Sequence, residues 1–469
     1  MRRTKIVGTI GPASIELSVM KKLVQAGLNV IRINLSHAKL EDMEKIFNNV
    51  KIIRNELKVP LPIMVDTRGP EIRVKTFKDG SAKIKRGQKF VFTARSVEGN
   101  ENIVSLNNPE IVNNVKEGNK ILAVNGLLSF KVIAVEGKDI ITKAINSGVI
   151  SNRKSLSIPG VKFSTPYLNS ADKKDILWAI EKDIEYIAAS FVNTKEDVET
   201  LRRFITKNGG NMKIISKIES CLGVKNVDEI IDASDAVMVA RGDLGVEVPM
   251  SKLPNIQELI IKKSVCKGKA VITATEMLES MISSNRPTRA EVSDVANAVY
   301  DGTSCVMLSG ETAAGNFPVE AVKTMAQVAE EAEKHIKYAH EFIKPEICLN
   351  SIADTISHSA VNASFAHNVK AIMCFTDEGK SAGRISRFRP AVRIIGATPN
   401  EKVYRQLDLL WGVTPVLTPV YDSIDEMFEI GDEFVKKSGF AKKGDCIIIT
   451  SGTPKKTGST NIIKISEIK

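Results

Sequence analysis

The 469-residue chain lacks the segments that would place it in a membrane or outside the cell. No apolar run approaches the roughly 18 residues that a transmembrane helix requires. The six cysteines form no CxxC pair and show no metal-like spacing, which is typical of a reducing compartment. The N-terminus turns polar too soon for a signal peptide. We therefore expect a cytoplasmic protein with no membrane contact and no disulfide framework.

The formal charge of +11 is not concentrated in a tail or a basic helix, the pattern that would favour a nucleic-acid partner. Most of the excess lies in residues 68–165, where 17 Lys and Arg stand against 8 Asp and Glu. Few aromatic residues interrupt these basic positions, so we expect no nucleic-acid binding. Two interpretations of the basic segment stay open: the solvated surface of a small domain, or a basic lid over a phosphorylated ligand.

Outside that segment, short apolar strands alternate with helical patterns. Strands that are apolar throughout are typical of a parallel sheet buried on both faces. Eight of them in βα alternation favour a (β/α)8 barrel over an open doubly wound sheet, and no GxGxxG motif follows the first strand. The eight predicted barrel strands are Lys5–Ile10, Asn29–Asn34, Pro62–Asp66, Tyr186–Ser190, Lys213–Lys217, Ala236–Ala240, Ala270–Ala274 and Cys305–Leu308.

The remaining segments predict two further units. At roughly 150 residues per domain, the length indicates about three domains. Residues 68–165 carry short β-type runs between Gly- and Asn-rich turns, and after about Pro345 a second α/β pattern begins. We therefore expect an α/β protein with a (β/α)8 TIM barrel (residues 1–67 and 166–345), an inserted small β-barrel lid domain (68–165) and a C-terminal α/β domain (346–469).

Charged residues stand where barrel strands end, and in this fold catalytic groups gather at the carboxyl ends of strands. Lys217 and Glu219 lie two residues apart and point to the same side of the fifth strand. Buried charges are costly unless they pair or bind something, so these two form either a structural ion pair or a ligand site. Asp243 follows the sixth strand, and two carboxylates at one rim favour Mg²⁺. Gly242 could offer a backbone N–H to an anion there.

Polar residues also follow the second, third and seventh strands. Arg32, Asn34 and Ser36 alternate and so share one side of the second strand and its exit. The third strand ends in Asp66 and Thr67, and the seventh ends near Thr275. Charged strand ends can equally form salt bridges that only stabilise the barrel.

Taken together, these segments resemble the pyruvate kinase family, whose motifs follow one another here in family order. The matching segments are TKIVGTIGPAS (4–14), RINLSH (32–37), DTRGPEIR (66–73), IISKIES (214–220), VMVARGDLGVE (237–247), TATEMLESM (273–281), RPTRAEVSDVANAV (286–299) and DGTSCVMLSGETAAG (301–315). The resemblance implies transfer of the phosphoryl group of phosphoenolpyruvate to ADP, giving pyruvate and ATP. It also implies Mg²⁺ (or Mn²⁺) and K⁺ as cofactors, a homotetramer and a regulatory C-terminal domain.

The resemblance also implies roles for residues at matching positions. Lys217, Arg32 and Thr275 would be catalytic and would bind substrate together with Gly242 and Asp243. The Mg²⁺ ligands would be Glu219 and Asp243, and the K⁺ ligands Asn34, Ser36, Asp66 and Thr67. The nucleotide contacts would be Asn34, His37, Arg73 and Lys154. A sugar-phosphate effector would meet Thr376, Lys380, Ser381, Lys455 and Lys456.

Glu71 bears on the cation requirement. In the family, a Glu five positions after the K⁺-ligating Asp is typical of K⁺-activated members, whereas a Lys there accompanies K⁺ independence. Glu71 therefore predicts K⁺ activation, unless it simply pairs with Arg68 or Arg73.

Two other functions are compatible with parts of this pattern. A Mg²⁺-dependent lyase or aldolase acting on a pyruvate enolate could use the same carboxylate pair, but it would need neither a basic lid nor the K⁺-type oxygen cluster. A non-catalytic binding protein would have no use for Lys217, Glu219 and Asp243. ADP-dependent release of pyruvate distinguishes all three.

Overall fold

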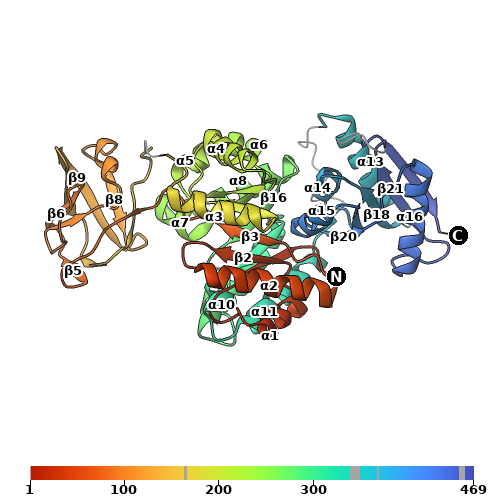
Figure 1. Ribbon diagram of the computed structural model, residues 1–469, viewed down its shortest axis with the longest axis horizontal. Helices are drawn as coiled ribbons and strands as arrows, with labels where there is room; N and C mark the ends of the chain where they lie inside the picture. The colour runs from red at the N-terminus through yellow and green to blue at the C-terminus, as the bar shows by residue number, and fades with distance from the viewer. Residues whose placement is uncertain (1, 163–165, 339–348, 367–368, 454–459, 469) are drawn as a thin grey trace.

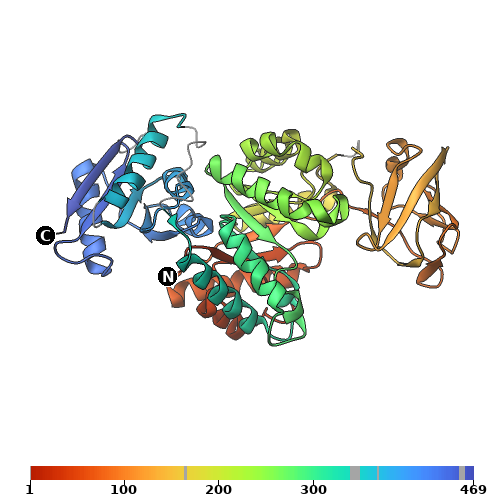
Figure 2. The same ribbon diagram turned by 180° about the vertical axis from the view of Figure 1, so that it is seen from behind.

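The computed structural model describes residues 2–162, 166–338, 349–366, 369–453 and 460–468. Three parts lie in a row, with a β module at one end, a barrel in the middle and an α/β unit at the other end (Figure 1). The view from behind shows the same order (Figure 2). Within the described ranges, no helix has the length and apolar character needed to span a membrane.

Eight parallel strands close the central barrel, which confirms the predicted fold. The strands are β1 (Lys5–Thr9), β2 (Val30–Asn34), β3 (Ile63–Asp66), β13 (Tyr186–Ala189), β14 (Lys213–Ile218), β15 (Ala236–Ala240), β16 (Ala270–Ala274) and β17 (Cys305–Leu308). β1 pairs with both β2 and β17, so the sheet has no free edge. Each strand end lies within one residue of its predicted position.

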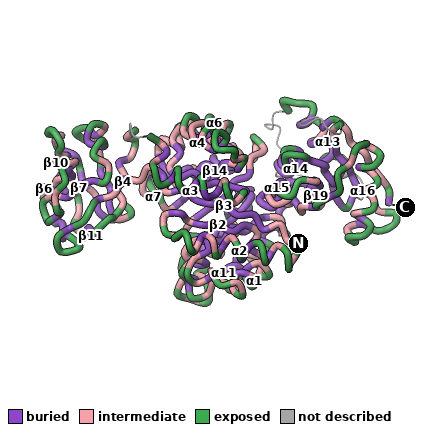
Figure 3. Tube along the Cα trace, viewed as in Figure 1, coloured by how far each residue is buried: buried purple, intermediate pink, exposed green. Residues whose placement is uncertain are grey.

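Helices surround the barrel and cover its outer face (Figure 3). In α4 the residues Val198, Leu201 and Ile205 recur at helical spacing and are buried against the sheet. Thr194 and Asp197 form a capping box at the start of this helix, which fixes where it begins. The barrel helices are α1 (Leu17–Ala26), α2 (Leu40–Leu57), α3 (Ser170–Glu181), α4 (Lys195–Lys207), α5 (Cys221–Lys225), α6 (Val227–Ala233), α7 (Arg241–Glu247), α8 (Leu253–Cys266), α9 (Arg289–Tyr300), α10 (Gly310–Ala313) and α11 (Pro318–Lys334).

The β module has its own core and extends from the carboxyl ends of the barrel strands. Phe90, Phe92 and Phe130 pack with ring centroids 5.1–5.5 Å apart in that core. Seven strands form one sheet in the order β4-β12-β8-β9-β10-β6-β7, and β11 pairs with β5. The strands are β4 (Ile72–Arg73), β5 (Ser81–Ile84), β6 (Lys89–Thr93), β7 (Ile103–Ser105), β8 (Lys120–Ala123), β9 (Leu128–Glu136), β10 (Asp139–Ala144), β11 (Gly148–Ser151) and β12 (Ser155–Ser157).

The C-terminal unit is a five-stranded sheet with helices on both faces. Its order is β20-β19-β18-β21-β22, and only β22 runs antiparallel to its neighbour. Side chains of α13 and α14 pack on one face of the sheet and those of α16 on the other. The elements are α13 (Ile352–Ala366), β18 (Val369–Phe375), α14 (Lys380–Arg387), β19 (Arg393–Thr398), α15 (Glu401–Gln406), β20 (Val413–Leu417), α16 (Ile424–Lys437), β21 (Cys446–Ser451) and β22 (Ile462–Glu467).

The C-terminal unit contacts the amino ends of the barrel strands. The Lys5 ammonium at the start of β1 lies 2.6 Å from the Asp408 carboxylate, and the Tyr186 hydroxyl at the start of β13 donates to the Gln406 carbonyl at 2.5 Å. The opposite, carboxyl rim of the barrel therefore faces the β module rather than the C-terminal unit.

Candidate functional site

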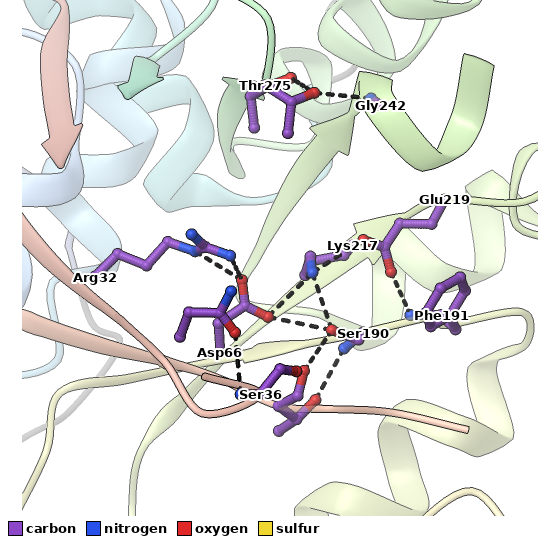
Figure 4. Close-up of polar contacts among 12 residues, drawn as sticks. Arg32, Ser36, Asp66, Ser190, Phe191, Lys217, Glu219, Gly242 and Thr275 are labelled. Carbon is purple, nitrogen blue, oxygen red and sulfur yellow. Dashed lines mark hydrogen bonds and ion pairs between the residues drawn. The ribbon is translucent and has the colours of Figure 1, made fainter. Parts of the chain in front are cut away.

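Lys217 lies at the centre of a polar cluster at the carboxyl rim of the barrel (Figure 4). Its ammonium lies 3.0 Å from Asp66 Oδ1, 2.9 Å from Ser190 Oγ and 2.9 Å from Glu219 Oε1. The side chain is only 10% exposed, and those of Asp66 and Glu219 are 1% exposed. β14 and β3, which lie on either side of β13, thus bring a buried cation and two buried carboxylates together. Lys217 and Glu219 face each other, as their alternation predicted.

Asp66 is held between two cations. Arg32 donates from Nε at 2.7 Å to Asp66 Oδ2, and the Lys217 ammonium donates to the other carboxylate oxygen, Oδ1. Burial alone would raise the pKa of Asp66, but Lys217 and Arg32 together hold it below its usual value. Burial would likewise lower the pKa of Lys217, but Asp66 and Glu219 raise it above the usual lysine value. Lys217 is therefore a permanently charged ammonium.

Glu219 and Asp243, unlike Asp66, have pKa values above the usual value of a carboxyl group. Burial first, and then repulsion from Asp243 and Asp66, raise the pKa of Glu219 to about 7 despite the nearby Lys217. Burial also raises the pKa of Asp243, with further contributions from Glu71 and Asp66. For both groups, burial and repulsion from neighbouring carboxylates outweigh the attraction of Lys217.

The donor set at this position fits a divalent cation. Glu219 Oε2 accepts from the Phe191 N–H at 2.7 Å, whereas the buried Oε1 faces Lys217 without an aligned hydrogen bond. Among the described residues, no group of three or more His, Cys, Asp or Glu side chains could hold a metal. Mg²⁺ keeps several water or substrate oxygens, so Glu219 and Asp243 suffice as protein ligands.

Thr275 and Gly242 lie together at a neighbouring part of the rim (Figure 4). The Gly242 N–H donates to Thr275 Oγ1 at 2.8 Å, so this N–H is not free, in contrast to the expectation from sequence. Thr275 has a φ of 69°, which is strained for a β-branched residue and is seen mostly where surrounding contacts enforce it. The buried guanidinium of Arg241 supplies such a contact, because it donates to the Thr275 carbonyl at 2.6 Å and pairs with Asp294 at 2.7 Å.

The residues predicted to bind K⁺ gather where β2 and β3 end. Asn34 and Asp66 stand opposite each other in register, and Asn34 Oδ1 accepts from the Ser36 N–H at 3.1 Å. The Thr67 carbonyl accepts from the Ser190 hydroxyl at 2.7 Å. The four positions thus form one oxygen-rich corner beside Lys217, although both oxygens of Asp66 already accept hydrogen bonds.

The residues predicted to bind nucleotide fall into two pairs. Asn34 and His37 lie at the exit of β2, where the His37 N–H donates to the Asn34 carbonyl at 3.1 Å. Arg73 and Lys154 belong to the β module, on and beside the paired strands β4 and β12. Arg73 forms an ion pair of 2.6 Å with Glu71, the pairing considered as an alternative above.

The predicted effector residues lie in the C-terminal unit. Thr376 Oγ1 accepts from the Gly379 N–H at 3.0 Å, and the Ser381 hydroxyl lies 2.7 Å from that of Thr460. Lys380 pairs with Glu378 at 2.5 Å. Lys455 and Lys456 lie outside the described residues.

Sequence reasoning missed two residues of the rim, Ser190 and Arg241. Ser190 is the first residue after β13 and bonds to Lys217, Asp66 and Thr67. Its position is the signal in the sequence, because residues that directly follow other barrel strands also lie at the rim. Arg241 follows β15 directly, but nothing in the sequence shows that its side chain turns back to the loop after β16.

Comparisons with known proteins point to one family for both the N-terminal two-thirds of the chain and the C-terminal unit. The family model described as pyruvate kinase, barrel domain, matches residues 1–322, and that described as pyruvate kinase, alpha/beta domain, matches residues 354–466. Pyruvate kinase of Geobacillus stearothermophilus is 43% identical over the whole of this chain, which covers 80% of that protein. Pyruvate kinase of Clostridium acetobutylicum is 38% identical, with 100% of both chains covered.

Among solved structures, a pyruvate kinase from Cryptosporidium parvum superposes with a TM-score of 0.94 and 36% sequence identity. The match covers 100% of this chain and 96% of that one. Together with the closed barrel and the charged cluster at its rim, these matches show that the chain belongs to the pyruvate kinase family.

Proposed function

We propose that the rim site transfers the phosphoryl group of phosphoenolpyruvate to ADP, giving pyruvate and ATP. The observation that carries this proposal is the buried Lys217 ammonium, held between Asp66 and Glu219 at the carboxyl rim of the barrel. Phosphoryl transfer demands positioning and fixed positive charge rather than covalent chemistry by the protein. A cation that burial and two carboxylates fix in place meets that demand without reorganisation.

The substrate would be held by side chains of four strand ends. Arg32 would bind the phosphate, since its NH1 donates to Thr9 at 2.8 Å and so holds the guanidinium at the rim. Lys217 would stabilise the negative charge on the phosphoryl group during transfer. Gly242 and Asp243 would bind the substrate carboxylate through their N–H groups, which for Gly242 requires the Thr275 hydroxyl to give way. Thr275 would take part in protonating the enolate carbon.

Glu219 and Asp243 would hold Mg²⁺ or Mn²⁺. Their raised pKa values and the buried Glu219 Oε1 without an aligned hydrogen bond support this assignment. When bound, the metal supplies positive charge to oxygens of the phosphoryl group and the enolate. Phe191 supports the site by donating its N–H to Glu219, which orients the carboxylate.

The monovalent cation and the nucleotide would bind beside this centre, with Asn34 contributing to both sites. The K⁺ ligands would be Asn34, Ser36, Asp66 and Thr67. Asn34 and His37 on the barrel and Arg73 and Lys154 on the β module would contact ADP. A basic module at the rim would then act as a lid, the second of the two interpretations of its charge.

The assembly and regulation belong to the same proposal. We expect a cytoplasmic homotetramer with phosphoenolpyruvate and ADP or ATP as its partners, and with no nucleic-acid or membrane partner. Thr376, Lys380, Ser381, Lys455 and Lys456 would form an effector pocket. Glu378 belongs to the same segment as Thr376, Lys380 and Ser381, and its carboxylate would repel phosphate, so we expect at most weak activation by fructose 1,6-bisphosphate.

The direct test is a coupled assay of pyruvate release from phosphoenolpyruvate. We expect release that requires both ADP and Mg²⁺, with ATP formed in equal amount. A lyase or aldolase acting on a pyruvate enolate, which the comparisons do not favour, would release pyruvate without ADP. Release that ADP does not affect would overturn the proposed function.

A further inference from the structure

The peptide group between Ser190 and Phe191 directly supports the proposed metal ligand. It follows β13 at the carboxyl rim, and its N–H, which belongs to Phe191, donates to Glu219 Oε2 at 2.7 Å (Figure 4). Its carbonyl, which belongs to Ser190, accepts from the Tyr167 hydroxyl at 2.9 Å. Because a trans peptide group is planar, its C=O and N–H point in opposite directions and turn together. Tyr167 and Glu219 therefore hold the same rigid group from opposite sides.

The backbone at this peptide is strained and would relax if it were released. Phe191 has a φ of 53°, in the left-handed region that bulky residues rarely adopt. A flip of the peptide changes ψ of Ser190 and φ of Phe191 by about half a turn, which would bring this φ into the extended region. The flipped peptide would direct its carbonyl oxygen, instead of its N–H, toward Glu219. The peptide thus has two arrangements, and only one of them supports the carboxylate.

Tyr167 has the properties needed to hold the supporting arrangement. Its side chain packs against the apolar core of the barrel, which fixes the position of its hydroxyl. Burial, and then the carboxylates of Asp197 and Asp172, raise the pKa of Tyr167 well above its usual value. The hydroxyl therefore keeps its proton and donates it to the Ser190 carbonyl, which can only accept.

Both crossings of the chain between the barrel and the β module meet at this peptide. The outgoing segment lies against it at Gly69, where an added Cβ would be 2.9 Å from Ser190 Cβ and 3.2 Å from the Ser190 carbonyl oxygen. The returning segment, between β12 and α3, carries Tyr167. At the start of α3, the buried Asp172 accepts from the Arg68 N–H at 2.9 Å, which joins the two crossings. The path of the chain from the β module and the orientation of the peptide are therefore linked.

We propose that Tyr167 is a positioning residue for the metal ligand Glu219 and acts through the Ser190–Phe191 peptide. The segment that returns from the β module thereby sets the affinity of the rim for a divalent cation. This inference rests on the proposed Mg²⁺ site and adds to it a residue that contacts neither the metal nor the substrate. Partners that orient a metal ligand are typically worth about 10- to 100-fold in metal affinity. Tyr167 acts one peptide further from the metal, so we expect an effect at the lower end of that range.

Calorimetric titration of the substrate-free full chain with Mn²⁺ tests this proposal. Tyr167→Phe removes only the hydroxyl and should weaken Mn²⁺ binding by about tenfold. Tyr186→Phe is the matched control, because the Tyr186 hydroxyl also donates to a backbone carbonyl, that of Gln406, at the opposite end of β13. Both variants lose one hydroxyl-to-carbonyl hydrogen bond, but Tyr186→Phe should leave the Mn²⁺ affinity within about twofold of that of the unmodified protein.

A second pair of variants displaces the same peptide from the other side. Gly69→Ala places a methyl group against Ser190 and should also weaken Mn²⁺ binding by about tenfold. Gly209→Ala is its control, because Gly209 has a similar φ of 78° but nothing within 4 Å of an added Cβ. Both alanines carry a similar backbone strain, so a difference in Mn²⁺ affinity between the two variants reports the contact with the peptide.

Turnover separates positioning of the metal ligand from a direct part in the reaction. In Tyr167→Phe the half-saturating Mg²⁺ concentration should rise by about tenfold, whereas kcat at saturating Mg²⁺ should stay within about threefold. Unchanged Mn²⁺ affinity in Tyr167→Phe, or an equal loss in Tyr186→Phe, would overturn the proposal. Because calorimetry needs no turnover, the expected loss of Mn²⁺ affinity without any ADP-dependent pyruvate release would support the role of Tyr167 and contradict only the proposed function.

Discussion

At the scale of single residues, the charged groups of the rim divide into two kinds. Lys217 and Asp66 stabilise each other in their charged forms, so neither changes its charge near neutral pH. Glu219 and Asp243 have raised pKa values because burial and repulsion from neighbouring carboxylates outweigh the attraction of Lys217. The first pair therefore provides fixed charge, and the second provides the groups that respond to a cation or a proton.

Metal affinity should fall as the pH falls through the pKa of Glu219. Below about 7 the carboxyl group holds a proton, and a divalent cation must displace it before it can bind. Competition with a single proton predicts that Mn²⁺ or Mg²⁺ binds about tenfold more weakly at pH 6 than at pH 8. Calorimetric titration of the substrate-free protein at the two pH values measures this. Equal affinities would show that Glu219 is ionised throughout and would remove the basis of the prediction.

Asp243→Asn should weaken the response to the metal and the binding of substrate together, because one residue serves both. We expect the half-saturating Mg²⁺ concentration to rise by about tenfold or more, as is common when a metal ligand or its support is lost. Asp228→Asn is the matched control, since Asp228 pairs with Lys263 on the exposed surface. An unaltered Mg²⁺ response in Asp243→Asn would count against the metal assignment.

Several rim residues could be predicted from sequence, and others could not. Lys217 and Glu219 were predictable because two charges at period two interrupt an apolar strand. Ser190 has only the weaker signal of its position, since a serine after a strand is ordinary until its contacts are known. The bond between Gly242 and Thr275 joins the exits of two strands and depends on the unusual φ of Thr275, which no local pattern specifies.

At the scale of elements, β13 links the C-terminal unit to the rim. Glu185, which directly precedes this strand, is 1% exposed and accepts from the Ile63 N–H at 2.7 Å and from Arg54 at 3.0 Å. Its other oxygen accepts from Arg405 of α15. Ser190 follows the same strand and bonds to Lys217. A short, buried strand therefore connects the interface with α15 to Lys217.

Glu185→Gln should destabilise the protein by about 3 kcal/mol, because it removes the buried anion between Arg54 and Arg405 and leaves Arg405 with the exposed Asp183 and Glu401. The free energy of unfolding of the barrel, from denaturant titration, measures this. Glu401→Gln is the control: Glu401 also pairs with Arg405 but is 77% exposed, so its loss should cost less than about 1 kcal/mol. A similar loss of stability in both variants would show that burial does not determine how much an ion pair with Arg405 contributes to the free energy of unfolding.

The elements themselves were largely predictable, and the omissions have physical causes. All eight barrel strands are apolar and flanked by turn residues, so their bounds could be predicted to within a residue. β20 has no clear strand signal in the sequence, because Pro415 interrupts its pattern, a residue tolerated here on the outer strand of the sheet. β4 and β12 have only two and three residues, too few for any alternation.

At the scale of the whole molecule, the arrangement of the three parts separates the proposed chemistry from its regulation. The β module lies at the carboxyl rim and the C-terminal unit at the amino ends of the strands (Figure 1). The contacts that fix this arrangement, such as Lys5 with Asp408, join residues about 400 positions apart and leave no trace in local sequence. The division at residues 67/68, 165/166 and 345/346 stays a prediction.

The requirement for K⁺ concerns the charge of the whole rim. Asp66, Glu71, Glu219 and Asp243 place negative charge around a trianionic substrate. Although Glu71 pairs with Arg73, it still contributes to the raised pKa of Asp243. We expect replacement of K⁺ by tetramethylammonium at constant ionic strength to lower activity strongly. Glu71→Lys should relieve most of that requirement, because the lysine supplies the missing charge covalently. Full activity of the unmodified protein without any monovalent metal cation would refute this account of Glu71.

The central claim is that Lys217 stabilises charge during phosphoryl transfer, and Lys217→Met tests it most directly. With phosphoenolpyruvate, ADP and Mg²⁺, kcat should fall by about a thousandfold or more, whereas the dissociation constant for phosphoenolpyruvate should change by less than about threefold. Lys334→Met is the matched control and should leave both values unchanged, because Lys334 pairs with Glu331 on the exposed face of α11. A fall in kcat of less than about tenfold in a folded Lys217→Met protein would contradict the account, since it would leave the buried ammonium with no role in the transition state.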